Sequence, residues 1–190
     1  AAFGGVTESM KALGIPVGCC ADGPSGIRMD CGTKAFSLPN GTALGCTFNT
    51  ELVSDLYEMT GKELRLNKID SLLGPGMNIH RNPLCGRNFE YYSEDPLVAG
   101  KIAAAMTNGV QKVPGCGTTI KHFACNNQED NRMGSDSVIS ERTLREVYLK
   151  GFEIAVRESQ PLSIMTSYNL INGVHAANNY DLCTETARNE

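Results

Sequence analysis

Short apolar runs alternate along the chain with longer segments in which apolar residues recur at helical spacing. Each short run is bounded by glycine, proline or polar residues, a pattern that is typical of buried β-strands. We therefore predict four strands, at residues 17–21, 69–74, 118–123 and 162–166.

The longer segments between these runs predict three amphipathic helices, at residues 50–68, 96–113 and 141–159. Asn49, Asp95 and Ser140 directly precede them, and each is a residue type that caps helix N-termini. Pro96 also suits a first helical position. We expect the first helix to bury a face that carries Leu52, Leu56, Met59 and Leu66.

This alternation of strands and helices predicts an α/β protein whose parallel strands are joined by right-handed crossovers. An open, doubly wound sheet and a (β/α)8 barrel both have this order of elements. A complete barrel takes about 250 residues. The 190 residues of the chain would then form one domain with about four βα units, roughly half of a barrel.

Composition narrows the range of functions. Hydrophobic residues make up 41% of the chain and charged residues 20%, which is ordinary for a globular protein. The net charge is −4 and no basic run interleaves with aromatic residues, so we expect no nucleic-acid partner. No apolar stretch approaches the roughly 18 residues of a membrane span, so we expect no membrane role.

Eight cysteines are many for this length, but no C-x-x-C pair of the kind that zinc sites use is present. A disulfide framework fits the count, yet a chain of this size has enough core not to need one. We interpret the cysteines as mostly reduced and buried, as in a cytoplasmic protein, and expect no metal and no cofactor. Both ends resemble cuts in a longer chain, so the lack of a signal peptide says little about location.

Polar side chains follow each predicted strand, at the edge where ligands bind in both α/β architectures. The loop over residues 75–95 is also far longer than the usual two to six residues, which is typical of a functional loop. We expect a ligand site at this edge. Its candidate residues are Asp22, Arg28, Arg87, Lys121, His122, Arg132 and Tyr168.

Several of these candidates also have a purely structural interpretation. Asp22 starts an Asp-Gly-Pro stretch that favours a turn for backbone reasons alone, although a carboxylate here could also accept hydrogen bonds from two sugar hydroxyls. Lys121 could reach solvent beside a structural histidine. Two adjacent long donors at a strand end, Lys121 and His122, nevertheless suit a polar pocket that donates to hydroxyls.

Arg87 could pair with a glutamate to brace its loop, and such bracing would also make it a preorganised donor. Arg132 could be solvated, and the ring of Tyr168 could cap the core. No G-x-G-x-x-G, P-loop or G-x-S-x-G motif is present, so dinucleotide binding, phosphoryl transfer and α/β-hydrolase chemistry have no support. An isomerase or aldolase would need metal ligands or a Schiff-base lysine, for which Lys121 is the candidate.

Six stretches of the chain, taken together and in order, resemble glycoside hydrolase family 3 and in particular its β-glucosidase branch. They are ADGPSGIR (21–28), GPGMNI (74–79), GRNFE with SEDP (86–96), KHFA (121–124), MTSYN (165–169) and NG (172–173). The family combines a (β/α)8-type barrel with an α/β sandwich domain. The resemblance therefore implies a partial TIM-like barrel, with residues 1–190 as a truncated catalytic domain.

The resemblance also implies a pocket for the terminal sugar of a β-glucoside or oligosaccharide substrate. Its lining would comprise Asp22, Arg28, Arg87, Lys121, His122, Arg132, Met165 and Tyr168. Asp22 would hold the hydroxyls farthest from the reacting carbon, and three of the basic residues would grip the middle of the ring. Met165 and Tyr168 would lie near the reacting face, where Tyr168 could orient the nucleophile.

By the same resemblance, the parent enzyme is a retaining exo-β-glucosidase that uses two carboxylates. The family's nucleophile is an Asp in an Asp-Trp segment on a later strand, and this chain contains no Trp. We therefore expect the nucleophile beyond Glu190, no catalytic residue in this chain and no activity from it alone.

The alternatives are a β-xylosidase, whose branch tends to have Glu in place of Asp22, and a non-catalytic sugar-binding half-barrel. Open strand edges could pair with the missing remainder of the parent or with a second copy.

Overall fold

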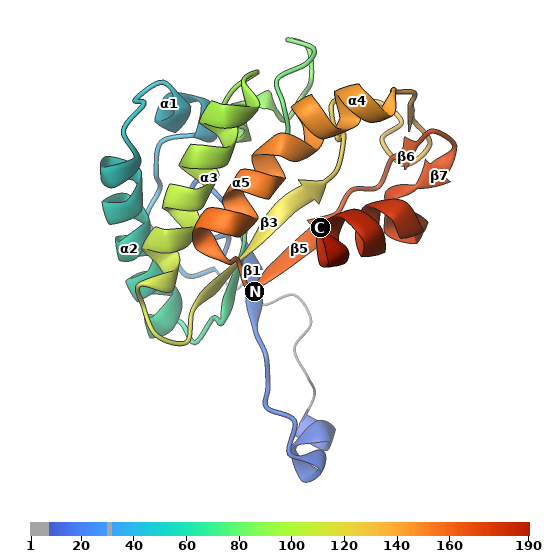
Figure 1. Cartoon of the computed structure of the whole chain (residues 1–190). Helices are drawn as coiled ribbons and strands as arrows, with labels where there is room; N and C mark the ends of the chain where they lie inside the picture. The colour runs from blue at the N-terminus through green and yellow to red at the C-terminus, as the bar shows by residue number, and fades with distance from the viewer. Residues whose placement is uncertain (1–7, 30–31) are drawn as a thin grey trace.

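The protein is represented by a computed structural model that describes residues 8–29 and 32–190. Its main sheet has four parallel strands, and the strands lie side by side in the order in which they occur along the chain (Figure 1). They are β1 (Cys20–Asp22), β2 (Ser71–Leu73), β3 (Gly117–Phe123) and β5 (Ser163–Thr166). A doubly wound sheet reverses its strand order at a switch point, whereas a barrel does not. The observed order therefore confirms the partial barrel.

Three long helical segments connect the strands and pack side by side over one face of the sheet (Figure 1). They are α2 (Thr50–Leu66), α3 (Pro96–Gln111), and α4 (Glu141–Thr143), which continues through η3 (Leu144–Leu149) into α5 (Lys150–Ser159). The three predicted caps are confirmed, because the side chains of Asn49, Asp95 and Ser140 each accept a hydrogen bond from a backbone N–H of the first turn.

Shorter elements lie in the loops. A small second sheet contains β4 (Asp136–Ser137), β6 (Leu170–Ile171) and β7 (Val174–His175). The short helices are η1 (Glu8–Leu13), α1 (Gly41–Gly45), η2 (Asn88–Glu90) and η4 (Ala176–Asn178), and η5 (Asp181–Asn189) follows near the C-terminal end. The loop after β2 and the small sheet both lie near the carboxyl ends of the main strands, where they can form the wall of a site.

The buried face of α2 differs from the predicted one. Leu52, Met59 and Leu66 are exposed and Leu56 is only partly buried. The helix instead buries Val53, Tyr57, Thr60, Gly61 and Leu64. The reason lies in a close approach to α3, since a Cβ built on Gly61 would come within 2.7 Å of the carbonyl oxygen of Val110. The glycine face is the face on which the two helix backbones can approach each other.

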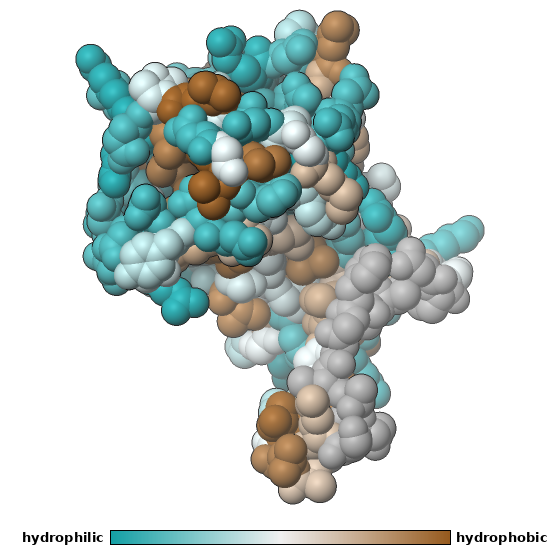
Figure 2. All heavy atoms as spheres, turned by 90° about the vertical axis from the view of Figure 1, so that its right-hand side faces the viewer, coloured by the Kyte–Doolittle hydropathy of each residue, from teal (hydrophilic) through white to brown (hydrophobic). Residues whose placement is uncertain are grey.

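The first strand begins later than predicted. Val17 is 48% exposed, and backbone pairing with the β2 segment starts only at Cys19, whose carbonyl oxygen accepts from the backbone N–H of Asp70. The residues before it lead away from the body to η1 (Figure 1). Figure 2 shows that the described atoms of this projecting segment are mainly apolar. The apolar run at residues 17–21 therefore predicted the end of the strand to within one residue but placed its start three residues too early.

The cysteines are less buried than predicted. Cys85, Cys116 and Cys125 are buried, whereas Cys46 is exposed and Cys19, Cys20 and Cys183 are partly buried; Cys31 lies outside the described residues. The expectation that most cysteines are buried is therefore wrong. Within residues 8–29 and 32–190, no group of three or more His, Cys, Asp or Glu side chains is placed to hold a metal ion. No helix in that part of the chain has the length and apolarity needed to cross a bilayer.

Candidate active site

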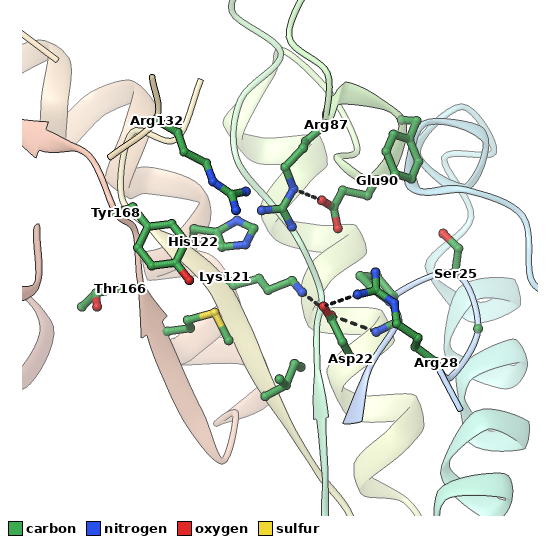
Figure 3. A pocket seen from close by; sticks show the side chains of 16 residues that line it. Asp22, Ser25, Arg28, Arg87, Glu90, Lys121, His122, Arg132, Thr166 and Tyr168 are labelled. Atoms are coloured by element: carbon green, nitrogen blue, oxygen red, sulfur yellow. Dashed lines mark hydrogen bonds and ion pairs between the residues drawn. The ribbon is translucent and has the colours of Figure 1, made fainter. Parts of the chain in front are cut away.

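A cavity of about 920 Å³ opens at the carboxyl ends of the parallel strands (Figure 3). Its lining includes all eight residues that the sequence predicted for a sugar pocket: Asp22, Arg28, Arg87, Lys121, His122, Arg132, Met165 and Tyr168. These residues come from four different strand ends and loops, as expected for a site at this edge of a barrel. Their assignment as sugar-binding residues stays a prediction.

An ion pair crosses one side of the cavity, from β3 to the end of β1 (Figure 3). The Lys121 side chain is 2% exposed, and its Nζ lies 2.5 Å from Oδ1 of Asp22. The Asp22 carboxylate also accepts from the backbone N–H of Gly23 at 2.9 Å and lies 3.6 Å from Nη1 of Arg28.

These contacts fix the charge of Asp22. Burial by itself would raise the pKa of its carboxyl group, but the hydrogen bond and charge of Lys121, helped by Gly23 and Arg28, outweigh burial and lower that pKa. The group is therefore an oriented carboxylate at neutral pH. Because 22% of its side chain remains exposed, it can still accept hydrogen bonds from a ligand.

The long loop after β2 supplies a second ion pair. Arg87 directly precedes η2, and its Nε donates to Oε1 of Glu90, three residues later and buried. Burial alone would lower the pKa of Arg87, but the hydrogen bond to Glu90 and nearby acidic groups raise it. The loop is fixed from outside by Thr42 of α1, whose hydroxyl lies within hydrogen-bonding distance of the carbonyl oxygens of Asn88 (2.9 Å) and Tyr91 (3.1 Å). The bracing that the sequence suggested for Arg87 is therefore present.

His122 lies in β3 and is buried against this loop. Its backbone makes two hydrogen bonds with the amide of Asn78, and its Nδ1 lies 3.3 Å from both Asn78 Oδ1 and the hydroxyl of Tyr91. Burial first, and then the charges of Arg87, Lys121 and Arg132, lower its pKa from 6.5 to about 2. The imidazole is therefore neutral at physiological pH.

The opposite wall carries Arg132 and Tyr168 (Figure 3). Nη1 of Arg132 donates to Oε2 of Glu129 at 2.8 Å, and its Cζ lies 5.2 Å from the centre of the Tyr168 ring, a cation–π contact. The Tyr168 ring does not cap the core, since the residue is 53% exposed. Its loop is held to the end of β3 by Ser167, whose hydroxyl donates to the carbonyl oxygen of Ala124 at 2.7 Å.

Sequence reasoning missed several residues of the site. Glu90, Phe89, Ser25 and Thr166 also line the cavity. Behind the wall, Asn126 donates from Nδ2 to the hydroxyl of Tyr91 at 2.8 Å and to Oε1 of Glu129 at 3.0 Å. The spacing of Glu90 three residues after Arg87 was a usable signal. The contact of Asn126 with Tyr91 joins residues 35 positions apart in the chain and had no local signal.

Parallel strands in chain order, with a polar cavity at their carboxyl ends, define the class: a (β/α)-barrel-type protein with a cavity at the edge where such barrels bind ligands. Within that class, the chain belongs to glycosyl hydrolase family 3, whose N-terminal domain pattern matches residues 4–190.

Named relatives carry the same segment. The β-glucosidase of Ruminococcus albus is 60% identical over 190 residues, which are 100% of this chain and 20% of that protein. The structure of β-glucosidase 3B from Thermotoga neapolitana in complex with glucose matches with a TM-score of 0.95 at 45% identity, over 100% of this chain and 27% of that chain. An exo-α-(1→6)-L-arabinopyranosidase of Bifidobacterium longum is 43% identical over 194 residues, which are 96% of this chain and 26% of that protein. The chain thus spans between 20% and 27% of the length of these relatives.

Proposed function

We propose that this chain forms the sugar-binding part of the active site of a retaining exo-β-glucosidase, which releases terminal, non-reducing β-D-glucosyl residues. The observation that carries the proposal is the cavity at the strand ends, in which one oriented carboxylate and several fixed cations face the same space. A relative that is named a β-glucosidase and a related enzyme whose structure contains glucose support this choice of sugar.

The wall chemistry suits a polyol. Each sugar hydroxyl can donate one hydrogen bond and accept up to two. The Asp22 carboxylate is held in place by Lys121, so it can accept from neighbouring hydroxyls without rearranging. Arg87 and Lys121 donate from side chains that carboxylates already orient, which lowers the entropic cost of binding a ligand. Asp22 and Tyr168 lie on opposite sides of the cavity (Figure 3), as the predicted sugar orientation requires.

The carboxylates of the cavity do not suit the two catalytic roles of a retaining glycosidase. Such an enzyme needs one carboxylate as nucleophile and one carboxyl group whose raised pKa lets it donate a proton. Asp22 has a lowered pKa and is paired with Lys121, and Glu90 is buried against Arg87. We propose that both catalytic carboxylates come from other parts of the parent enzyme and that residues 1–190 are a piece of its barrel domain.

Three further points belong to the same proposal. Within the described residues the sheet ends at β1 and β5, and we propose that the rest of the parent or a second copy pairs with these edges. A location in the cytoplasm fits the exposed thiol of Cys46. A β-xylosidase is disfavoured by Asp22, because the xylosidase branch tends to have Glu there.

Binding and turnover test the proposal separately. We expect D-glucose, titrated into the chain and followed by NMR, to bind in a saturable way and more tightly than D-xylose. Asp22→Ala and Arg87→Ala should abolish binding, whereas Arg142→Ala, at an exposed ion pair with Glu146 on another face, should not. An aryl β-glucoside should not be hydrolysed by this chain. Turnover by the pure chain, or binding that survives Asp22→Ala, would contradict the proposal.

A further inference from the structure

The His122 ring contacts neighbouring side chains through Nδ1, and the residue lines the cavity (Figure 3). Nδ1 lies 3.3 Å from Asn78 Oδ1 and 3.3 Å from the Tyr91 hydroxyl, while no described residue forms a hydrogen bond with Nε2. A neutral imidazole has one N–H donor and one bare acceptor nitrogen. The partners of Nδ1 therefore decide what Nε2 offers to a ligand.

The amide of Asn78 can take only one orientation. Its Nδ2 donates to the carbonyl oxygen of His122 at 2.8 Å, and its Oδ1 accepts from the backbone N–H of the same residue at 2.8 Å. A flipped amide would lose both hydrogen bonds, so the atom that faces Nδ1 is an oxygen. An amide oxygen accepts and cannot donate. A proton on Nδ1 makes this contact attractive. A bare Nδ1 would instead place its lone pair against a lone pair of the Asn78 oxygen, which is repulsive.

Tyr91 is the competing partner, because a hydroxyl can either donate or accept. Its oxygen already accepts a hydrogen bond from Asn126 Nδ2 at 2.8 Å, which leaves it free to act in either way toward Nδ1. With the proton on Nδ1, both neighbouring oxygens attract the ring. With the proton on Nε2, Tyr91 could still donate, but the fixed oxygen of Asn78 would repel Nδ1. The fixed orientation of the Asn78 amide therefore favours the Nδ1–H tautomer over the Nε2–H tautomer.

We propose that Asn78 is a positioning residue that holds His122 in the Nδ1–H tautomer, so that Nε2 accepts a hydrogen bond from a hydroxyl of the ligand. This reverses the donor role that the sequence suggested for His122. The identity of the ligand as a sugar rests on the proposed function. The three cations nearby, Arg87, Lys121 and Arg132, are donors, so the same hydroxyl can give its proton to Nε2 and accept from a cation.

The charge state of the ring agrees with this arrangement. Burial and the same three cations hold its pKa near 2, so no second proton occupies Nε2 in the physiological range. The carboxylates on either side, Glu90 and Glu129, already accept from Arg87, Arg132 and Asn126. Asn78 itself does not line the cavity, so it acts on a ligand through His122.

The test is a long-range ¹H–¹⁵N correlation spectrum of the 190-residue chain without ligand. His80→Gln and His175→Gln assign the remaining signals to His122. We expect the wild type and Tyr91→Phe to show a protonated Nδ1 and a bare Nε2, and Asn78→Ala to lose this preference. A protonated Nε2 in the wild type, or a switch of tautomer in Tyr91→Phe, would overturn the inference even if Asn78→Ala fails to fold.

Addition of D-glucose separates this inference from the proposed function. If glucose binds, we expect the Nε2 resonance to move in the direction of an accepted hydrogen bond while Nδ1 stays protonated. Replacement by fluorine of the one hydroxyl that faces Nε2 should weaken binding by about tenfold, since fluorine cannot donate. Glucose that binds without moving Nε2 would overturn the inference. Glucose that does not bind would contradict the proposed function, and the ligand-free tautomer would still decide the role of Asn78.

Discussion

The pair of Lys121 and Asp22 predicts an asymmetry that stability measurements can detect. Its two members differ in surroundings, because the lysine side chain is 2% exposed and the aspartate side chain 22%. Asp22→Asn removes the negative charge that faces the buried ammonium group. Lys121→Met removes the ammonium group but leaves a carboxylate that keeps the N–H of Gly23, the nearby Arg28 and some water.

These surroundings set the magnitudes. Removal of one partner from a buried ion pair costs about 3–5 kcal/mol, because the other charge remains without compensation. We expect Asp22→Asn to lower the free energy of unfolding by that amount. Lys121→Met loses a charge-assisted hydrogen bond of about 1.5–3 kcal/mol and strands a carboxylate that stays partly solvated, so it should cost less. The double variant leaves no charge uncompensated and should cost less than the sum of the single changes.

The assay is urea unfolding of the four proteins at pH 7, followed by far-UV circular dichroism because the chain contains no Trp. The pH dependence of the free energy of unfolding is a second check. The pKa of Asp22 is lowered in the folded state. The carboxylate therefore stabilises the fold fully above the unfolded pKa of about 3.9, and this stabilisation is lost as the pH falls through the lowered pKa. A cost for Lys121→Met equal to that of Asp22→Asn, or strictly additive effects, would refute the reasoning.

Three further predictions concern stability. Because the pKa of His122 is about 2 when folded and 6.5 otherwise, the unfolded chain binds a proton below pH 6.5 that the folded chain does not, and stability falls by up to about 1.4 kcal/mol per pH unit below it. In urea titrations, His122→Gln should flatten the slope between pH 6.5 and 5, and an unchanged slope would contradict the neutral, buried imidazole. Gly109→Ala should lower the free energy of unfolding by about 1–3 kcal/mol, because the new Cβ would lie 2.3 Å from a backbone carbonyl oxygen of α2. The control is Gly18→Ala, because Gly18 has open space around it. An equal effect of the two substitutions would contradict the close packing of α3 on α2. Asn49→Ala should cost about 1 kcal/mol and lower the melting temperature, because it removes the cap of α2, and an unchanged melt would contradict that role.

Local chemistry explains which parts of the fold the sequence could predict. The starts of the long helices follow from Asn49, Asp95 and Ser140, whose side chains bond to N–H groups two or three residues away. The buried face of α2 could not be predicted in the same way, because α2 carries large apolar residues around much of its surface. The contact of Gly61 with α3 selects the buried face, and that contact joins segments 49 residues apart.

In the candidate site too, the sequence predicted the residues that local patterns indicate and missed those that act over long separations in the chain. Residues such as Asp22, Lys121 and Tyr168 could be placed together because they follow parallel strands, whose carboxyl ends meet at one edge. The groups that set their chemistry are less visible in the sequence. Asn78 acts on His122 from 44 residues away, with a side-chain amide that bonds to the backbone of His122 and lies 3.3 Å from its Nδ1, and no local pattern in the sequence indicates these contacts.

The strand order of the main sheet has a consequence for the folding of the chain as it is synthesised. β2 pairs with β1, β3 pairs with β2, and β5 pairs with β3, so each strand requires only a neighbour that has already left the ribosome. The long helices follow the same order, since α3 packs on α2 and α5 packs on α3. We expect the sheet to grow from the N-terminal side by addition of one βα unit at a time, with the newest strand always serving as the template for the next.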